Sequence, residues 1–194
     1  MTNMKSVKTV IALCCVMIAG AVAATDYPEE IPFVPTPIEV VDRMLELVEV
    51  NKNDVVYDLG SGDGRIVIRA AKKYGARGVG IEMDKALVEQ ARRAAEADGV
   101  GHLVEFRSED ALKADLSPAT VVTLYMLPWF NEVMKPNFKK YLKPGSRIVA
   151  HDFAIEGWEP TKMEKLPRIE RGPGGYTHQH VIFLWRIGEQ PGLK

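Results

Sequence analysis

A predicted strand followed by three closely spaced glycines constrains the fold of this chain more than any other stretch. Residues 55–59 read Val-Val-Tyr-Asp-Leu, which is typical of a buried strand with Asp58 near its carboxyl end. Gly60, Gly62 and Gly64 follow, and a turn of this kind lets the backbone approach a ligand without Cβ clashes. An amphipathic helix comes next. A strand, a glycine-rich turn and a helix in this order predict the ligand platform of a doubly wound sheet.

Two acidic residues beside the turn indicate which ligand it suits. A dinucleotide site has G-x-G-x-x-G with a pyrophosphate on the helix N-terminus. Here the pattern is G-x-G-x-G, and Asp58 lies two positions before the first glycine. A carboxylate there repels a pyrophosphate and suits a cation, such as the amino group of S-adenosylmethionine. Glu82 ends a second predicted strand, where a carboxylate can accept both ribose hydroxyls. The alternative interpretation is a left-handed turn with a solvated acid at each strand end.

The N-terminal residues read as a targeting segment. Lys5 and Lys8 form a short basic start, and an unbroken run of 15 apolar and small residues follows. Ala-Val-Ala at 21–23 is an A-x-A cleavage motif. The run is short for a spanning helix, which needs about 20 residues. We therefore predict that residues 1–24 are a signal peptide and that the chain is exported, either periplasmic or secreted. The alternative is a membrane anchor over residues 9–24.

The rest of the chain has the composition of an ordinary globular protein, and its 194 residues suit one domain with a sizeable core. The formal net charge is −1, which gives no electrostatic case for a nucleic-acid partner. Both cysteines, Cys14 and Cys15, lie in the N-terminal apolar run. A domain without them has no disulfide, thiol nucleophile or cysteine-based zinc site.

The order of predicted elements indicates the fold class. Residues 25–36 form an extended Pro-rich lead before a single domain over 37–194. Thr36-Pro37-Ile38-Glu39 is typical of a capping box, so a helix is predicted to start there. Strands and helices then alternate up to a fifth strand at 147–151, and Gly-Pro-Gly-Gly at 172–175 is a hairpin signal between two further strands. The pattern predicts an α/β fold with a doubly wound, Rossmann-like, seven-stranded sheet. The sheet is mainly parallel, with one antiparallel strand in a C-terminal hairpin.

Three short segments carry a resemblance to a known family. They are Pro-Phe-Val-Pro-Thr-Pro at 32–37, Asp-Leu-Gly-Ser-Gly-Asp-Gly-Arg at 58–65 and Leu-Lys-Pro-Gly at 142–145. With the layout above, the chain resembles the class I S-adenosylmethionine-dependent methyltransferases over residues 31–188. The first segment is more restricted, and through it the chain is similar to the small protein-lysine methyltransferases of archaea. It is also similar to the mitochondrial lysine methyltransferases that modify membrane carriers and the ATP synthase ring. The resemblance implies an enzyme that N-methylates protein lysines, membrane proteins included.

The resemblance also implies which residues hold the cofactor, S-adenosyl-L-methionine. Asp58, Gly60 and Gly62 would surround its methionine part, and Glu82 would take the ribose. Asp110, which follows the third predicted strand, would lie near the adenine amino group. A helix N-cap or a loop acid is an equally good interpretation of Asp110.

The Pro-rich lead contributes two further residues in this family pattern. Phe33 and Thr36 are implied to close the cofactor site from the N-terminal side. Packing of Phe33 on the sheet is the alternative, since an aromatic residue before a helix commonly packs in that way.

The fourth predicted strand ends where an acceptor would enter. Enzymes that methylate exocyclic amines of nucleic acids usually have Asp or Asn before Pro-Pro-aromatic there, but residues 125–129 read Tyr-Met-Leu-Pro-Trp. A lysine needs desolvation and an aromatic channel instead. We therefore predict that Tyr125, Trp129 and Phe130 line such a channel, with core packing as the alternative. A helix is predicted after them, at about Asn131–Leu142.

Histidines and an aspartate near the later strands complete the candidate residues. Asp152 follows His151 at the end of the fifth predicted strand, and either Asp152 or a carbonyl would take the proton of the acceptor. His178 and His180 place two imidazoles on one strand face, but no third ligand is evident, so we expect no metal site. Two other functions stay open: a methyltransferase for a small molecule or lipid, and a non-catalytic cofactor-binding domain.

Overall fold

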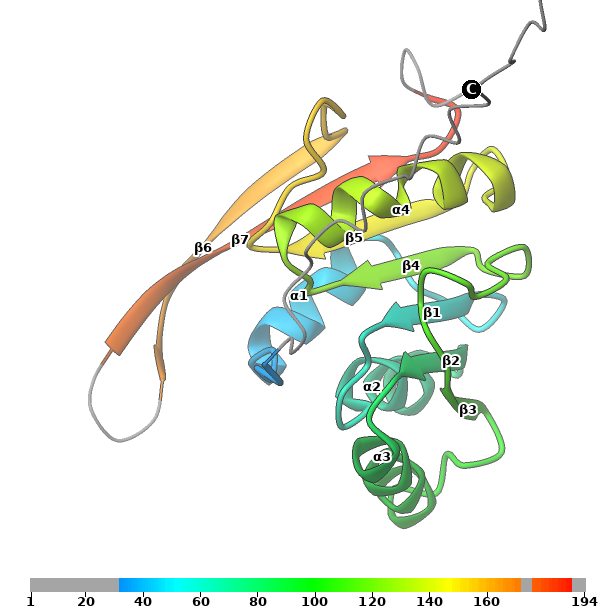
Figure 1. The fold of residues 1–194 in the computed structure, drawn as a ribbon. Helices are drawn as coiled ribbons and strands as arrows, with labels where there is room; N and C mark the ends of the chain where they lie inside the picture. Colours follow the sequence, from blue (N-terminus) through cyan, green and yellow to red (C-terminus); the bar gives the residue numbers. More distant parts are fainter. Residues whose placement is uncertain (1–31, 172–175, 190–194) are drawn as a thin grey trace, which may run out of the picture. The chain divides into compact units, whose positions relative to one another are not determined.

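The computed structural model describes residues 32–171 and 176–189 (Figure 1). The predicted targeting segment, residues 1–24, therefore lies outside the described residues, as do most of the Pro-rich lead and the Gly-Pro-Gly-Gly turn. Within the described ranges, no helix is both long enough and apolar enough to cross a lipid bilayer.

Seven strands of the described chain form one mixed sheet in the order β3-β2-β1-β4-β5-β7-β6. They are β1 Val55–Leu59, β2 Arg77–Glu82, β3 Val104–Ser108, β4 Val121–Leu124, β5 Arg147–His151, β6 Lys162–Arg171 and β7 Tyr176–Arg186. β1 to β5 run parallel, whereas β7 is antiparallel to both β5 and β6. The predicted fold, a mainly parallel seven-stranded sheet with a C-terminal antiparallel hairpin, is confirmed.

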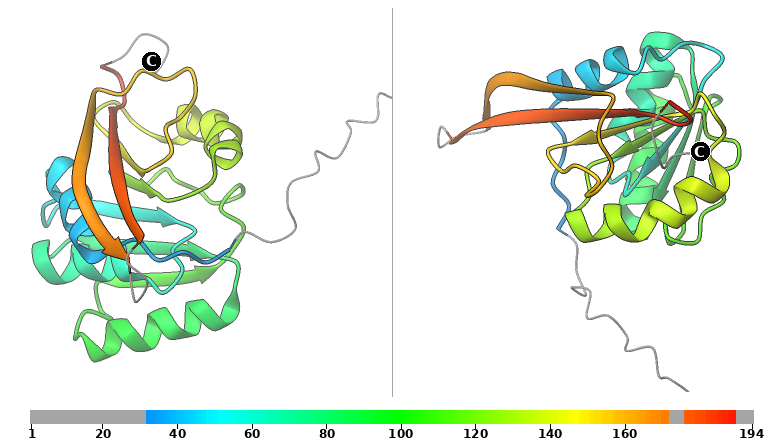
Figure 2. Two further views of the ribbon diagram at one scale, coloured as in Figure 1. Left: turned by 90° about the vertical axis from the view of Figure 1, so that its left-hand side faces the viewer. Right: turned by 90° about the horizontal axis from the view of Figure 1, so that it is seen from above.

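Helices cover both faces of this sheet (Figure 2). They are α1 Ile38–Leu47, α2 Arg65–Tyr74, α3 Lys85–Ala97 and α4 Pro128–Tyr141. α1, α2 and α3 share one apolar core with the sheet, in which Leu45 and Val67 are buried. α4 packs across the opposite face, where Met134 and Phe138 are buried. Each helix buries one apolar stripe, so the two cores leave the strand ends free to carry polar side chains.

Two helix starts differ from the prediction. α4 begins at Pro128 rather than Asn131, because proline fits the first turn of a helix. Trp129 and Phe130 therefore lie in the helix and not in a loop before it. The predicted capping box at α1 is wrong: Pro37 is the N-cap, and no side chain caps the helix. Thr36 lies one residue too early for that role, which leaves its hydroxyl for another partner.

The C-terminal hairpin is longer than predicted. β7 pairs with β5 only from Ile182 to Arg186, and Ile182 pairs with His151, the last residue of β5. β6 pairs with β7 further out, up to Arg171 with Tyr176. The hairpin therefore extends past the carboxyl end of β5 (Figure 1, orange). This end of the parallel strands is the edge at which ligands bind in folds of this class.

Candidate active site

The centre of the sheet contains the point where the strand order reverses. From β1 the chain moves to β2 and β3 on one side, and then to β4 and β5 on the other. Ligands of open α/β sheets bind outside the carboxyl ends of the strands at such a point. Asp58 lies near this end of β1, paired in register with Gly80 of β2 and Thr123 of β4.

Asp58 is a buried carboxyl group without a basic partner. It is 3% exposed, and its Oδ1 accepts a hydrogen bond of 2.6 Å from the Thr123 hydroxyl. Burial raises its pKa to about 7; the Thr123 hydrogen bond opposes this rise, while the charges of Asp63 and Glu82 add to it. Among the described residues, no Lys, Arg or His forms an ion pair with it. A cationic ligand beside Asp58 would therefore stabilise the ionised form.

The glycine turn after β1 has no room for side chains. Gly60 and Gly62 have φ angles of 76° and 53°, in the left-handed region. A Cβ on Gly60 would lie 2.5 Å from the sulfur of Met126, and a Cβ on Gly62 would clash with the ring of Phe33. Phe33 of the lead therefore lies directly over the turn, as the sequence predicts for a residue that closes the site.

Glu82 is held at the carboxyl end of β2 by two backbone groups. Its Oε2 accepts a hydrogen bond from Gly62 N–H and its Oε1 accepts one from Asp84 N–H, both at 2.9 Å. A carboxylate oxygen has two acceptor sites, so each oxygen keeps one for a ligand hydroxyl. The two contacts fix the carboxylate beside the glycine turn, where the predicted ribose contact requires it.

Asp110 is a local turn residue in this structure. Its Oδ1 accepts a hydrogen bond of 3.0 Å from Leu112 N–H, and its Oδ2 pairs with Lys113 Nζ at 3.2 Å. These contacts favour the loop-acid interpretation. Its role at the adenine amino group stays a prediction.

Thr36 and Arg65 fasten the lead to the site. Thr36 is 3% exposed, and its Oγ1 lies 3.3 Å from His151 Nδ1. Arg65 donates to the Thr36 carbonyl at 2.9 Å while its guanidinium pairs with Asp63. The sequence analysis did not assign a role to Arg65, although it directly follows the glycine motif. The lead is thus attached both to the glycine turn and to the end of β5.

Aromatic rings gather after β4 and β5. The Tyr125 ring lies 4.0 Å from the His151 ring and stacks at 6.3 Å on Phe153, measured between centroids. Phe153 was missed by the sequence analysis, and its position just after the fifth strand was the available signal. Trp129 packs edge-on against Phe130 at 5.9 Å. Phe130 is 4% exposed and belongs to the core of the α4 face, so its predicted place in the channel is wrong.

Asp152 lies among three imidazoles. Its Oδ1 accepts a hydrogen bond of 2.9 Å from Val181 N–H, and its Oδ2 lies 3.0 Å from His178 Nε2 and 3.3 Å from His180 Nδ1. Burial acts to raise the pKa of Asp152, but the Val181 N–H and the neighbouring imidazoles hold it below its usual value. A carboxylate with a lowered pKa is a weak base. The predicted role of proton acceptor stays a prediction that this environment does not favour.

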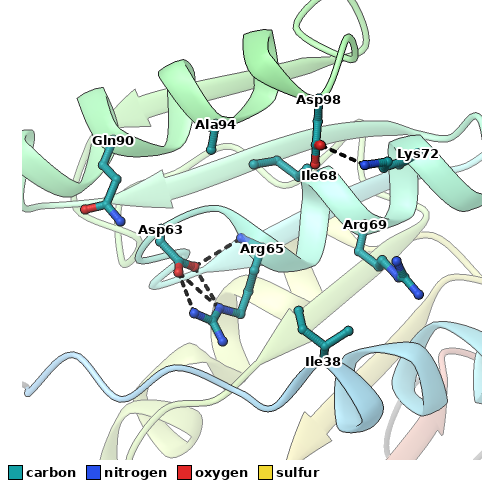
Figure 3. A pocket seen from close by; sticks show the side chains of 9 residues that line it. All are labelled: Ile38, Asp63, Arg65, Ile68, Arg69, Lys72, Gln90, Ala94 and Asp98. Atoms are coloured by element: carbon teal, nitrogen blue, oxygen red, sulfur yellow. Dashed lines mark hydrogen bonds and ion pairs between the residues drawn. The ribbon is translucent and has the colours of Figure 1, made fainter.

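A hollow of about 290 Å³ lies elsewhere, among α1, α2 and α3 (Figure 3). It is lined by charged side chains, with Asp63 and Arg65 on one side and the Lys72–Asp98 ion pair on another (Figure 3). Neither Asp58 nor any strand-end acid lines it. The strand edge, and not this hollow, is therefore the candidate active site.

Comparisons with known proteins agree with this site. Residues 58–162 match the family model described as the ANTKMT methyltransferase domain. A protein-lysine N-methyltransferase of Saccharolobus islandicus is 42% identical, over 84% of this chain and 98% of that protein. A mouse lysine N-methyltransferase that is named for an ATP synthase component is 30% identical, over 84% of this chain and 69% of that protein. A crystal structure described as an RNA methyltransferase from Salinibacter ruber with S-adenosyl-L-homocysteine has a TM-score of 0.73. It is 51% identical and covers 81% of this chain and 96% of that one.

Proposed function

The chain belongs to the ANTKMT methyltransferase-domain family of S-adenosylmethionine-dependent enzymes, and on this premise we propose that it N-methylates lysine side chains of proteins. The observation that carries the proposal is the 42% identity with a protein-lysine N-methyltransferase along nearly the whole length of that relative. The site geometry supports it at both the cofactor side and the acceptor side.

The residues at the strand edge fit the cofactor. Asp58 is a buried carboxylate without a cation, which suits the cofactor's ammonium group. Gly60 and Gly62 form a turn without room for a Cβ, and Glu82 has acceptor sites left for the ribose hydroxyls. When bound, S-adenosylmethionine supplies a methyl group on a positively charged sulfur. Phe33 and Thr36 lie where they exclude water from this turn.

The aromatic residues after β4 suit an amine acceptor. A lysine must be neutral to attack, and removal of water around it lowers the pKa of its ammonium group. Tyr125 and Phe153 offer stacked ring faces that orient an amine side chain. The chain's residues therefore have to desolvate and align the nucleophile rather than activate the methyl group.

The Salinibacter structure makes RNA the second candidate acceptor. The local chemistry after β4 favours lysine over a base. The amide nearest to the strand end, Asn131, is fully buried, and its Nδ2 donates to the carbonyl of Phe153 at 3.1 Å. It is thus occupied by the backbone and cannot hold an exocyclic base amine. The chain's net charge of −1 also gives no steering toward a polyanion.

One competition experiment separates these acceptors. The full chain is incubated with methyl-labelled cofactor, a membrane protein extract and total RNA in one vessel, and the label is measured in protein, RNA and lipid fractions. Label in the protein fraction, lost in an Asp58→Ala control, supports the proposal. Label in RNA alone would establish the second candidate, and label in lipid alone would establish a lipid methyltransferase.

We also propose that residues 1–24 direct the chain to a membrane, as a cleaved export signal or as an anchor over residues 9–24. The basic start and the apolar run motivate this proposal. A membrane protein is then the acceptor within easiest reach, in keeping with the mouse relative that is named for an ATP synthase component. An anchored form would keep the domain at a membrane surface where both cofactor and acceptor can be present.

A further inference from the structure

Four side chains from two distant segments converge at the carboxyl end of β5. His151 and Asp152 end this strand, and His178 and His180 lie on the part of β7 that extends past it. Asp152 Oδ2 lies 3.2 Å from His151 Nε2, 3.3 Å from His180 Nδ1 and 3.0 Å from His178 Nε2. His151 Nε2 and His180 Nδ1 are 2.7 Å apart. Three nitrogens and one oxygen therefore surround a single point.

Hydrogen bonds alone do not explain this arrangement well. His151 Nε2 and His180 Nδ1 point at each other and also at the same carboxylate oxygen. A neutral imidazole has one proton, so either one nitrogen turns a lone pair toward the carboxylate or two N–H groups face each other. A cation at the common point would accept the lone pairs of all the converging atoms together.

The spacing fits a tetrahedral transition metal. Zinc bonds to histidine nitrogen and carboxylate oxygen at about 2.0–2.2 Å, so ligand atoms of a tetrahedral site lie about 3.3 Å apart. The observed separations of 2.7–3.3 Å are close to this value. Among the described residues, His151, Asp152 and His180 already form a group whose ligand atoms lie within 4.8 Å of one another.

We propose that these residues bind one zinc ion, with His151, Asp152 and His180 as buried ligands and His178 as the exposed fourth ligand. His151 and His180 are fully buried, whereas the side chain of His178 is 54% exposed. Thr36 Oγ1 lies 3.3 Å from His151 Nδ1, where it accepts the proton of the other ring nitrogen and fixes the tautomer that binds metal through Nε2. This inference does not depend on the proposed function.

The ion would have a structural role beside the active site. It would join the end of β5 to the extended hairpin and, through His151, hold Thr36 of the lead and the ring of Tyr125. None of the cofactor residues Asp58, Glu82 or Gly62 belongs to the cluster. The sequence analysis saw only the pair on β7, because its partners precede it by almost thirty residues in the chain.

Metal content tests the proposal without any measurement of activity. The full chain is incubated with excess zinc, desalted and analysed by mass spectrometry for metals, and zinc affinity is measured by competition with a chromophoric chelator. We expect one zinc per chain in the wild type and in His102→Gln, a matched control that removes an exposed histidine outside the cluster. We expect zinc affinity to fall at least about tenfold in His178→Gln and to be lost in His180→Gln.

Cobalt gives an independent readout of the site's geometry. Co²⁺ in the proposed N₃O site should show the intense visible bands of tetrahedral coordination, weakened in His178→Gln and unchanged in His102→Gln. If His180→Gln fails to fold by circular dichroism, the exposed His178→Gln variant decides. A wild-type chain without zinc after the incubation, or zinc retained equally by His178→Gln and His180→Gln, would overturn the proposal.

Discussion

Asp58 is the single residue on which cofactor binding depends most in this account. Its position at the end of β1 was predictable from the alternation of apolar residues and glycines. Its hydrogen bond to Thr123 was not, because that contact joins residues 65 positions apart. The same limit applies to Arg65, whose bond to the Thr36 carbonyl spans 29 positions. Local pattern thus predicts which residues reach the strand edge, and tertiary packing decides which partners they meet there.

Asp58→Asn should stabilise the cofactor-free protein at neutral and higher pH. The native pKa of about 7 exceeds the usual 3.8, so the native state keeps a proton that the unfolded state loses. The free energy of unfolding of the wild type should therefore fall as pH rises between these two values, and level off above them. The amide lacks this penalty, which is at most about 4 kcal/mol. Urea denaturation at several pH values measures the gap between variant and wild type; a gap that does not widen from pH 5 to pH 7 would contradict the raised pKa.

Cofactor affinity should depend on both strand-end acids. Asp58→Ala removes the partner of the ammonium group, and Glu82→Ala removes the acceptor for the ribose hydroxyls. Each change should weaken binding by about 1.5–3 kcal/mol. Calorimetric titration with S-adenosylmethionine is the measurement, and Glu105→Ala, an exposed acid of β3, is the matched control. Near-wild-type affinity in both variants would remove the basis of the cofactor assignment.

At the scale of elements, the regular parts were predictable and the deviations have local causes. β1 and β5 have the predicted bounds because each is a short apolar run between polar or glycine boundaries. α4 starts three residues early, since Pro128 is compatible with a first helical turn, and this buries Phe130 in the core. The hairpin is longer than its apolar pattern suggests because its outer half pairs only with itself.

The element that follows β4 should affect the acceptor more than the cofactor. Tyr125→Leu removes the ring that stacks between His151 and Phe153. Turnover should fall several-fold or more, because the amine loses an oriented, desolvated approach, while cofactor affinity should stay close to that of the wild type. Steady-state kinetics with a labelled protein acceptor, together with cofactor titration, separate the two effects. Tyr141→Leu, at the far end of α4, is the control; equal losses in both variants would indicate general destabilisation.

At the scale of the whole molecule, the sequence predicted the sheet, the cofactor platform and the family, because these follow from repeated local patterns. It did not predict that the hairpin carries His178 and His180 to the end of β5. That contact depends on strand order, which places β7 and not β6 beside β5. The lead, the hairpin and the two central strands therefore meet at one edge of the sheet, although they lie far apart in the chain.

The N-terminal segment gives a prediction about the intact chain. If residues 1–24 are an export signal, cleavage should follow Ala23, and if they are an anchor, the intact chain should be recovered with membranes. N-terminal sequencing of protein from fractionated native cells distinguishes the two forms. An intact Met1 start in the soluble cytosolic fraction would contradict both.

The central claim, that lysine is the methylated group, is tested most directly by the chemistry of the product. Labelled protein from a reaction with the full chain is hydrolysed and its amino acids are separated. The account predicts label in methyl-lysine, formed at an initial rate that rises with pH as the acceptor amine loses its proton. Labelled protein without methyl-lysine, or label confined to nucleic acid, lipid or small metabolites, would contradict it.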